Sequence, residues 1–276
     1  MNSANAVPVL MYHHVSPHPG LVTVSPRTFE AQMAHLARAG YTALGADEFL
    51  DFLRGKRAVP RRSVLITFDD GYLDNYVYAY PVLARYGLRA VIFAVTGWIG
   101  DGPVRAHAGD GKAASLPATP DHRACKAAIA AGRAGEVMLR WSEIEAMEKT
   151  GAMEMHSHTH RHIRWDKHIP DAGRRLAELE ADLAASRAAL HQRLHKQSRH
   201  LCWPWGYYET GYQTVAEKCG FEALYTTHKG VNTAATPAQC VNRAVVKDKA
   251  GAWFATRLWI YGRPAAGALY TRLRGA

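Results

Sequence analysis

The stretch that most limits how this chain can fold is a short apolar run that ends in two adjacent carboxylates. Residues 64–68 are Val-Leu-Ile-Thr-Phe, and Asp69, Asp70 and Gly71 follow at once. The run has the length and composition of a buried strand in a parallel sheet. Both aspartates would then lie at the carboxyl end of that strand, where α/β sheets and barrels collect ligands and catalytic groups. A simple turn that closes the strand is the alternative, and the histidines farther along the chain bear on this choice.

Strand-like and helix-like segments alternate on both sides of this run. Apolar segments at residues 7–12, 41–44 and 88–96 are separated by helical patterns, of which the first begins at Pro26 after a Ser25 N-cap. This alternation indicates parallel strands joined by right-handed crossovers. About seven or eight such strands in one chain of 276 residues predict an irregular α/β barrel.

One segment interrupts the alternation. Residues 97–136 are rich in Gly, Ala, Pro and charged residues and show little periodicity. We expect an inserted loop there, and insertions of this length are usually active-site lids or disordered. The expected organisation is one domain over residues 1–250 that carries this insert, followed by a basic, aromatic helix or tail over residues 251–276.

Four histidines crowd into residues 156–162, directly after a short predicted strand. His158 and His162 are four residues apart, so on a helical turn they face the same way. Two imidazoles at this spacing and the Asp70 carboxylate would make a three-ligand site of the kind that catalytic zinc uses. A solvated His-rich loop or an adventitious metal patch is the alternative. Because both clusters follow predicted parallel strands, both would reach the same face.

The two aspartates can divide the chemistry between them. If Asp70 binds the metal, Asp69 stays free to act as the general base toward the water that the metal activates. Hydrolysis of an amide or ester also needs donors for the developing oxyanion. The Pro204-Trp205-Gly206 turn, which follows another predicted strand, is a candidate because its backbone N–H groups would point into the mouth of the barrel. A plain loop is the alternative for that turn.

Three segments together resemble one enzyme family. The strand Ile-Thr-Phe-Asp-Asp-Gly-Tyr is similar to the first motif of the polysaccharide deacetylases, also called the NodB-homology domain or carbohydrate esterase family 4. The histidine cluster is similar to the second motif, His-Thr/Ser-x-x-His, and Trp-Pro-Trp-Gly resembles the third. The opening Leu-Met-Tyr-His-His-Val looks like the branch that includes the poly-β-1,6-N-acetylglucosamine deacetylases. The resemblance runs from about residue 8 to residue 246.

This resemblance implies a fold, a reaction and a set of site residues. The fold would be a distorted (β/α) barrel with about seven parallel strands. The reaction would be metal-dependent hydrolysis of an N-acetyl group on a GlcNAc-type amino sugar, with one divalent ion: Zn²⁺ first, with Co²⁺, Ni²⁺ or Mn²⁺ as alternatives. The metal ligands would be Asp70, His158 and His162; the base would be Asp69, and the oxyanion donor the Trp205 backbone. The substrate-binding residues would be His13, Tyr72, Pro204, Trp205, Gly206 and Tyr207, and a purely structural histidine is the alternative for His13.

The sequence also departs from the family pattern. Many relatives carry an arginine two residues before the proline of the third motif, where it orients the base, and this chain has Cys202 there. The late leucine-x-histidine motif that supplies the general acid is not evident. His228 is a candidate for that role. Because of these departures, the alternative is that the protein is not an enzyme but a metal-containing relative that binds glycans.

Charge and the chain ends bear on partners. The chain has 34 Lys+Arg against 24 Asp+Glu, a net charge of +10, which favours anionic partners. No basic run is interleaved with aromatic residues as in nucleic-acid binding, so we expect no nucleic acid partner. The expected substrate is an amino-sugar glycan or glycolipid, either lipid-linked or lipopolysaccharide-type, with a polymeric exopolysaccharide as the alternative. The first residues show no basic and apolar leader pattern, from which we expect a cytoplasmic protein.

The C-terminal segment mixes aromatic and basic residues. Phe254, Leu258 and Tyr261 recur at helical spacing, with arginines between and after them. Helices of this composition can lie in a membrane interface, which would mean peripheral contact with an anionic inner membrane. The alternative is that this helix packs on the barrel and closes it.

Overall fold

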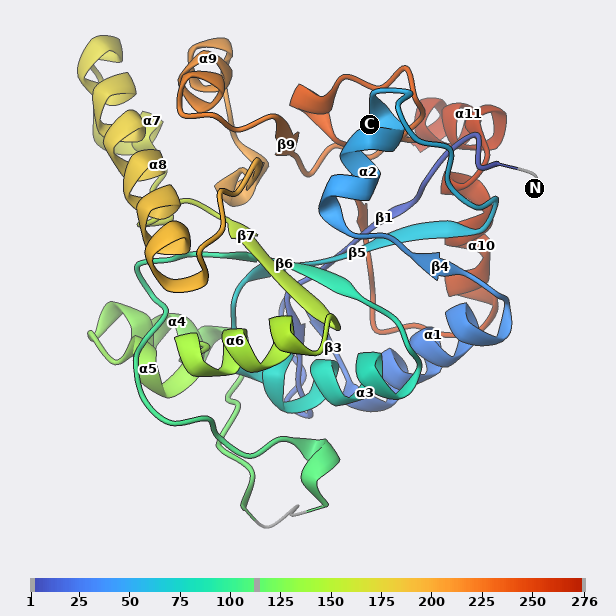
Figure 1. Ribbon diagram of the computed structural model, residues 1–276, viewed down its shortest axis with the longest axis horizontal. Coiled ribbons are helices and arrows are strands. Elements are labelled where there is room, and N and C mark those ends of the chain that lie inside the picture. Colours follow the sequence, from blue (N-terminus) through green and yellow to red (C-terminus); the bar gives the residue numbers. More distant parts are fainter. Residues whose placement is uncertain (1–2, 112–114, 275–276) are drawn as a thin grey trace.

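The computed structural model describes residues 3–111 and 115–274. Its centre is a sheet with the strand order β10-β1-β5-β6-β7-β8-β9, and β4 pairs with the beginning of β5 (Figure 1). Every strand pair in it is parallel, as the alternation of strands and helices predicts. The strands are β1 (Val9–Tyr12), β4 (Thr42–Ala43), β5 (Ser63–Asp70), β6 (Ala90–Ala94), β7 (Met153–Ser157), β8 (His200–Cys202), β9 (Ala223–Tyr225) and β10 (Ala244–Val245).

The sheet is strongly curled, and its two edges meet. An isolated parallel bridge between Tyr225 and Val241 joins β9 to the segment that leads into β10, which are the two ends of the strand order. A second, two-stranded sheet pairs β2 (His14–Val15) with β3 (Thr23–Val24). The predicted distorted (β/α) barrel with about seven parallel strands is confirmed.

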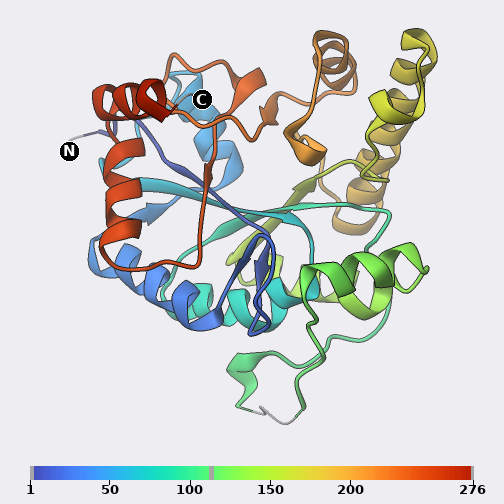
Figure 2. The same cartoon turned by 180° about the vertical axis from the view of Figure 1, so that it is seen from behind.

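Helices surround the sheet in both views (Figures 1 and 2). Ser25 caps the first one as predicted, because its hydroxyl accepts a hydrogen bond from the Thr28 amide. The helices are α1 (Pro26–Arg38), α2 (Ala46–Leu53), α3 (Tyr80–Arg85), α4 (His122–Ala130), α5 (Ala134–Val137), α6 (Trp141–Lys149), α7 (Trp165–His168), α8 (Ala172–Leu194), α9 (Thr210–Lys218), α10 (Ala252–Tyr261) and α11 (Pro264–Arg274).

Strand β5 forms the middle of the core. All eight of its residues are buried, and side chains at alternate positions face two different apolar clusters. Val64, Ile66 and Phe68 belong to one cluster, and Leu65 belongs to the other. A strand covered on both faces needs apolar residues without alternation, which explains why the sequence shows a continuous apolar run here.

The register of the sheet brings the charged motifs to one level. Asp70 is paired with Ala94, Ala94 with Ser157, and Ser157 with Leu201. The aspartates that end β5, the histidines that follow β7 and the turn that follows β8 therefore lie at the same end of the barrel. This is the edge at which parallel α/β folds hold their ligands.

The insert at residues 97–136 is partly helical and is attached to the barrel. It extends from one side of the molecule and returns through α4 and α5 (Figures 1 and 2). Arg105 donates two hydrogen bonds to the buried Glu143 carboxylate, at 2.7 and 2.8 Å, and a third to the Met138 carbonyl at 2.7 Å. Cys125 of α4 packs in an apolar cluster with Tyr72 of the barrel. These contacts fix the insert beside the carboxyl end of the strands.

Helix α10, the first helix of the C-terminal segment, packs on the barrel. Phe254, Leu258 and Tyr261 are buried in the main core cluster, and the Phe254 ring meets His35 of α1 edge-on at 5.9 Å. The helix therefore closes the barrel, and the expectation that these three side chains form a membrane-facing surface is wrong. Among residues 3–111 and 115–274, no helix has the length and apolar content needed to cross a bilayer.

Candidate metal centre and catalytic pocket

A pocket of about 210 Å³ opens at the carboxyl ends of the strands. It brings together the predicted metal ligands, the predicted base and part of the predicted substrate-binding set. The lining residues are His13, Leu21, Val22, Asp69, Asp70, His122, Lys126, His158, His162, Trp203, Trp205, Gly206 and Thr227. Tyr72 is buried behind the pocket with its ring stacked on His14 at 3.8 Å. Pro204 and Tyr207 line a neighbouring small cavity instead.

Asp70, His158 and His162 form a three-ligand cluster. The Nε2 atoms of both histidines lie 3.3 Å from the same atom, Asp70 Oδ1. This oxygen is buried and has no hydrogen-bond partner in the described part of the chain. Two ligands that each lie about 2.0–2.1 Å from a tetrahedral ion are separated by roughly 3.3 Å. The cluster therefore fits a divalent metal ion, which would satisfy the carboxylate oxygen that the protein leaves unpartnered.

The surroundings of the cluster orient its ligands. The Nδ1 atom of His158 lies 2.8 Å from the Cys202 carbonyl, so it carries the proton and leaves the Nε2 lone pair for a metal. The backbone is in the left-handed region at Asp70 (φ 73°) and His162 (φ 56°). In residues other than glycine this backbone conformation is higher in free energy, so contacts with the surrounding structure must stabilise it. Such residues concentrate at functional sites.

Asp69 is held by a buried arginine. Arg243, which precedes β10, donates from Nη1 to Asp69 Oδ1 at 2.6 Å and from Nη2 to Asp69 Oδ2 at 2.8 Å. Burial alone would raise the pKa of Asp69, but the Arg243 guanidinium, together with His13 and His158, keeps this pKa below its usual value. Across the pocket, His13 Nε2 lies 3.7 Å from Asp69 Oδ2. Asp69 is therefore ionised at neutral pH and faces a second proton-carrying group.

A second set of potential ligands, Asp69, His158 and Cys202, lies close together as well. Both oxygens of Asp69 are already engaged by Arg243, and the Cys202 thiol lies 3.0 Å from Arg243 Nη2. Burial also raises the pKa of Cys202, which disfavours the thiolate that a metal needs. The Asp70 set is the better metal site on both counts.

The turn after β8 offers one free amide to the pocket. The amides of Gly206 and Tyr207 bond to the carbonyls of Trp203 and Pro204, at 2.9 and 3.1 Å. The Trp205 amide has no acceptor within the described residues, and Trp205 itself has a φ of 62°. A Cβ on Gly206 would collide with the Thr227 side chain, so only glycine fits here. Trp205 lines the pocket, so its free N–H stays the candidate oxyanion donor.

The insert supplies part of the pocket wall through α4. His122 and Lys126 both line the pocket, and Lys126 Nζ lies 4.5 Å above the centre of the Trp205 ring. His122 Nδ1 is 3.1 Å from His14 Nε2, and His14 Nδ1 is 2.6 Å from Asp74 Oδ2. This Asp–His–His chain connects α4 to the buried interior of the barrel.

Three of these residues were absent from the sequence-based interpretation. Arg243 lies in the apolar stretch over residues 240–246, and a single arginine inside a predicted strand was the signal that could have marked it. His122 and Lys126 had no signal that pointed to the pocket, because their segment shows little periodicity. His228, the candidate acid, does not line the pocket; its Nδ1 lies 3.5 Å from Cys240 Sγ and its ring faces Tyr208.

His156, the first histidine of the cluster, belongs to the interior and not to the pocket. Its Nδ1 lies 2.9 Å from Ser198 Oγ, and its ring meets His200 at 4.6 Å. Burial, reinforced by His200, lowers the pKa of His156 to about 4. In the folded protein the His156 side chain is therefore neutral above about pH 4.

This buried histidine should make the folded protein sensitive to mild acid. Between pH 6.5 and about 4 the unfolded chain binds a proton at this position that the folded protein does not, so stability falls as the pH falls. The loss amounts to about 3 kcal/mol at most, from the difference between the two pKa values. Urea unfolding of metal-free protein should show a smaller loss over this range in His156→Gln. Equal losses in both proteins would contradict the assignment, since all other histidines are unchanged.

Comparison with known proteins finds relatives that are all named as polysaccharide deacetylases or N-deacetylases. The sequence model of the family described as "Polysaccharide deacetylase" matches residues 56–224. The YxkH protein of Bacillus subtilis, named as a polysaccharide deacetylase, is 29% identical over 224 residues, which are 81% of this chain and 65% of YxkH. The poly-β-1,6-N-acetyl-D-glucosamine N-deacetylase of Staphylococcus aureus is 25% identical over 232 residues, 83% of this chain and 69% of that protein. The chain thus spans slightly less than two thirds of YxkH.

Solved structures show the same fold. IcaB from Ammonifex degensii superposes with a TM-score of 0.71 at 23% identity, and covers 94% of this chain and 98% of its own. The deacetylase PplD of Streptococcus pyogenes, solved with acetate, superposes with a TM-score of 0.69 at 21% identity, and covers 90% of this chain and 95% of its own. The curled parallel sheet is common to all three.

Proposed function

Because the chain belongs to the polysaccharide deacetylase family, we propose that it hydrolyses the N-acetyl group of a GlcNAc-type sugar in a bacterial glycan. One observation supports this most strongly: two adjacent aspartates have different partners. Asp70 Oδ1 lies between two histidine nitrogens, whereas both oxygens of Asp69 are held by Arg243. This separation provides a metal ligand and a general base side by side, as amide hydrolysis requires.

Asp70, His158 and His162 would hold the metal ion. Zn²⁺ is the first choice because two imidazoles and one carboxylate with open positions are typical of catalytic zinc. Co²⁺, Ni²⁺ and Mn²⁺ accept the same donors, so occupancy depends on availability as well as affinity. When bound, such an ion acts as a Lewis acid toward the acyl oxygen and acidifies the attacking water.

The remaining residues would carry the protons and the developing charge. Asp69, kept ionised by Arg243, accepts the proton of the attacking water. The Trp205 amide, which has no acceptor in the described chain, donates to the oxyanion. His13, 3.7 Å from Asp69, is better placed than His228 to return a proton to the departing amine. His122 and Lys126 close one side of the pocket around the sugar.

The substrate class has two candidates. The name of the Staphylococcus aureus relative favours a polymer of β-1,6-linked N-acetylglucosamine. A lipid-linked or lipopolysaccharide-type amino sugar is the second candidate, and the net charge of +10 suits an anionic glycolipid. A cytoplasmic location, with or without peripheral contact with the inner membrane, remains a separate prediction.

A non-catalytic glycan-binding role is less well supported. One of the two departures that favoured it was Cys202 in place of the arginine that orients the base. Arg243 supplies a guanidinium to the same carboxylate from the segment just before β10. The base therefore keeps its cationic partner although the third motif has changed.

Metal removal tests the proposal directly. Acetate release should be measured on N-acetylglucosamine oligomers and on an N-acetylated glycolipid, with protein stripped by a chelator and then reloaded with Zn²⁺ or Co²⁺. We expect release to fall to background on stripping and to return on reloading, and the better substrate distinguishes polymer from glycolipid. Stoichiometric metal binding without acetate release from any of these substrates would favour the glycan-binding role.

A further inference from the structure

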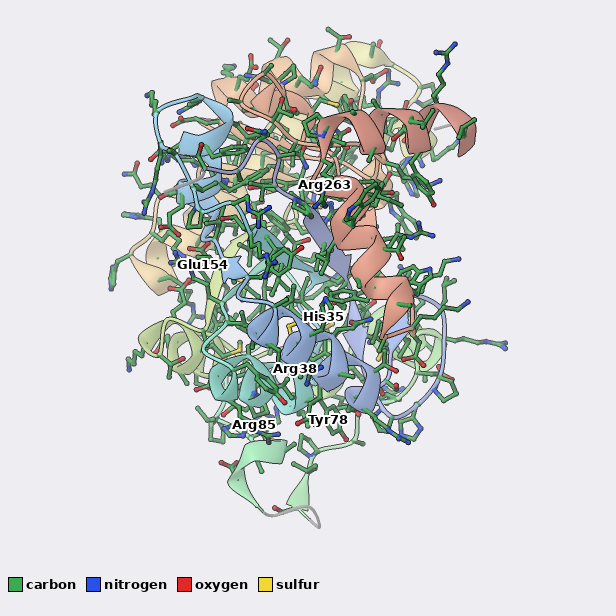
Figure 3. The ribbon with its side chains drawn as sticks, turned by 90° about the vertical axis from the view of Figure 1, so that its right-hand side faces the viewer. His35, Arg38, Tyr78, Arg85, Glu154 and Arg263 are labelled. Carbon is green, nitrogen blue, oxygen red and sulfur yellow. The ribbon has the colours of Figure 1, made fainter. Side chains whose placement is uncertain are left out.

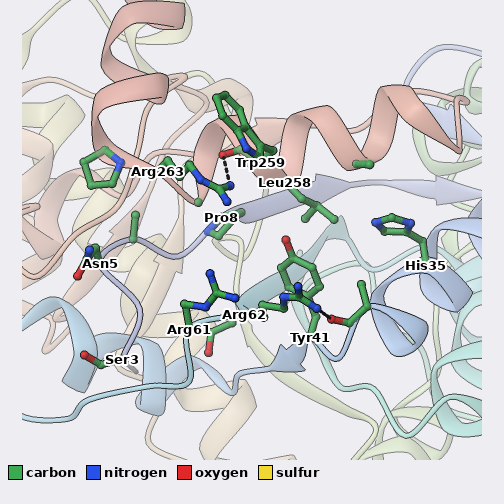
Figure 4. Close-up of a pocket in the computed structure, with 16 residues that line it drawn as sticks. Ser3, Asn5, Pro8, His35, Tyr41, Arg61, Arg62, Leu258, Trp259 and Arg263 are labelled. Atoms are coloured by element: carbon green, nitrogen blue, oxygen red, sulfur yellow. Dashed lines mark hydrogen bonds between the residues drawn. The ribbon is translucent and has the colours of Figure 1, made fainter. Parts of the chain in front are cut away.

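A second groove, of about 380 Å³, lies at the opposite end of the barrel from the metal centre. Its lining includes Pro8 before β1, Tyr41 before β4 and Ser63 at the start of β5, so it opens at the amino ends of these strands. Helix α10 and its C-terminal turn cover the other side (Figure 4). The eight residues of β5 separate the two sites by roughly 23 Å at the usual rise of a strand.

Three arginines, Arg61, Arg62 and Arg263, line this groove, and no aspartate or glutamate does. Twelve other arginines in the described chain form ion pairs with carboxylates. None of the three groove arginines does so within residues 3–111 and 115–274. Like charges repel when they converge without a counter-charge, so this grouping is unfavourable unless an anion completes it.

Two of the three guanidiniums are held in position. Arg263 donates to the Trp259 carbonyl at 3.3 Å and lies 4.9 Å from the centre of the Trp259 ring. Arg62 donates to the Ala39 carbonyl. Arg61 has no protein partner among the described residues. In Figure 4, Arg61 and Arg62 come from the segment before β5, and Arg263 and Trp259 come from the end of α10 opposite them.

The groove also offers neutral donors and an apolar wall. Asn5 and the Tyr41 hydroxyl line it beside the arginines, and the Trp259 side chain is 51% exposed. Burial raises the pKa of Tyr41, while Arg62, Arg263 and Arg61 all act in the opposite direction, so all three cations are close enough to act on this hydroxyl. Arg263 and His35 mark this side of the molecule in Figure 3.

We propose that this groove is a binding site for a phosphate-type anion, held by Arg61, Arg62 and Arg263, with the indole of Trp259 beside it. Arginine suits this role because its planar donors match the oxygens of a phosphoryl group and stay charged at every physiological pH. The ligand can be a soluble phosphorylated compound or the head group of an anionic phospholipid, since both present the same chemistry. The site does not depend on the proposed deacetylase activity, because it lies far from the metal centre.

Calorimetric titration with sodium pyrophosphate tests the site on the metal-loaded protein. The informative variant is Arg61→Gln/Arg263→Gln, and the matched control is Arg27→Gln/Lys56→Gln, which loses the same charge from exposed positions outside the groove. We expect the groove variant to bind pyrophosphate about tenfold more weakly or worse, because two charge-assisted contacts are lost. The control should bind like the unaltered protein.

Co-sedimentation with phosphatidylcholine vesicles, with and without phosphatidylglycerol, separates the two sources of the anion. Binding to the phosphatidylglycerol vesicles that is lost in the groove variant and displaced by pyrophosphate would assign a lipid head group. Arginine-dependent pyrophosphate binding without vesicle binding would assign a soluble ligand. The proposal would be overturned if the protein bound neither pyrophosphate nor phosphatidylglycerol vesicles. It would also be overturned if the groove variant bound pyrophosphate as tightly as the unaltered protein, which is the result expected if pyrophosphate binds only at the metal centre.

Discussion

The Asp69→Asn protein should bind Zn²⁺ as tightly as the unaltered protein and yet release acetate about 10²–10⁴ times more slowly, the usual contribution of a general base. Asp69 accepts hydrogen bonds from Arg243, and the predicted metal ligand is the neighbouring Asp70. Asparagine keeps the shape of the side chain but cannot accept the proton. Both the Zn²⁺ affinity and the rate of acetate release should be measured on this variant, and we expect only the rate to fall.

The matched variant is Asp70→Asn, which makes the same exchange of one carboxylate oxygen for an amide nitrogen in the adjacent residue. It should lose metal affinity and activity together, because Asp70 Oδ1 is the atom that both histidine nitrogens approach at 3.3 Å. If both variants lost metal affinity equally, the assignment of Asp70 as a metal ligand and Asp69 as the general base would be refuted. Circular dichroism and thermal unfolding should accompany both assays, because Asp69→Asn leaves the buried Arg243 without its counter-charge.

The sequence predicted the strands and the two charged motifs well for a physical reason. Residues 64–68 are buried on both faces, so their apolar run is continuous and ends sharply where the carboxylates begin. In a parallel sheet the carboxyl ends meet at one edge, so two motifs that end strands could be predicted to lie together without knowledge of the strand order. Helix α10 was expected from the helical spacing of its apolar residues. That spacing does not tell whether the barrel or a membrane covers the apolar face.

Other parts of the site depend on contacts between distant segments. Arg243 reaches Asp69 because β10 pairs with β1 and β1 pairs with β5, an arrangement that joins residues 174 positions apart. Strand β10 has two residues, too few for a pattern. His122 lines the pocket because the insert is attached through contacts such as Arg105–Glu143. Local periodicity carries no information on either placement.

The buried ion pair between Arg243 and Asp69 is where a single substitution should affect stability most. Arg243→Met keeps the apolar volume but leaves the Asp69 carboxylate buried without its cation, which typically costs about 3–5 kcal/mol. Urea unfolding at pH 7 measures this loss. The double variant Arg243→Met/Asp69→Asn should recover a large part of it, because no unpaired charge remains.

The pH dependence follows from the same pair. Arg243 lowers the pKa of Asp69 in the folded protein, so the pair stabilises the fold above the ordinary aspartate pKa of about 3.9 and loses this effect as the pH falls through the folded value. The difference in stability between the unaltered protein and Arg243→Met should therefore shrink as the pH falls from the Asp69 pKa of the variant to the lower Asp69 pKa of the unaltered protein. In the variant the contribution of Arg243 is lost while burial still raises the pKa of Asp69, so this pKa rises relative to the unaltered protein and the acidic limb of the rate profile should move to higher pH. A variant that lost stability but kept its rate profile would mean that Arg243 supports the fold without setting the charge of Asp69.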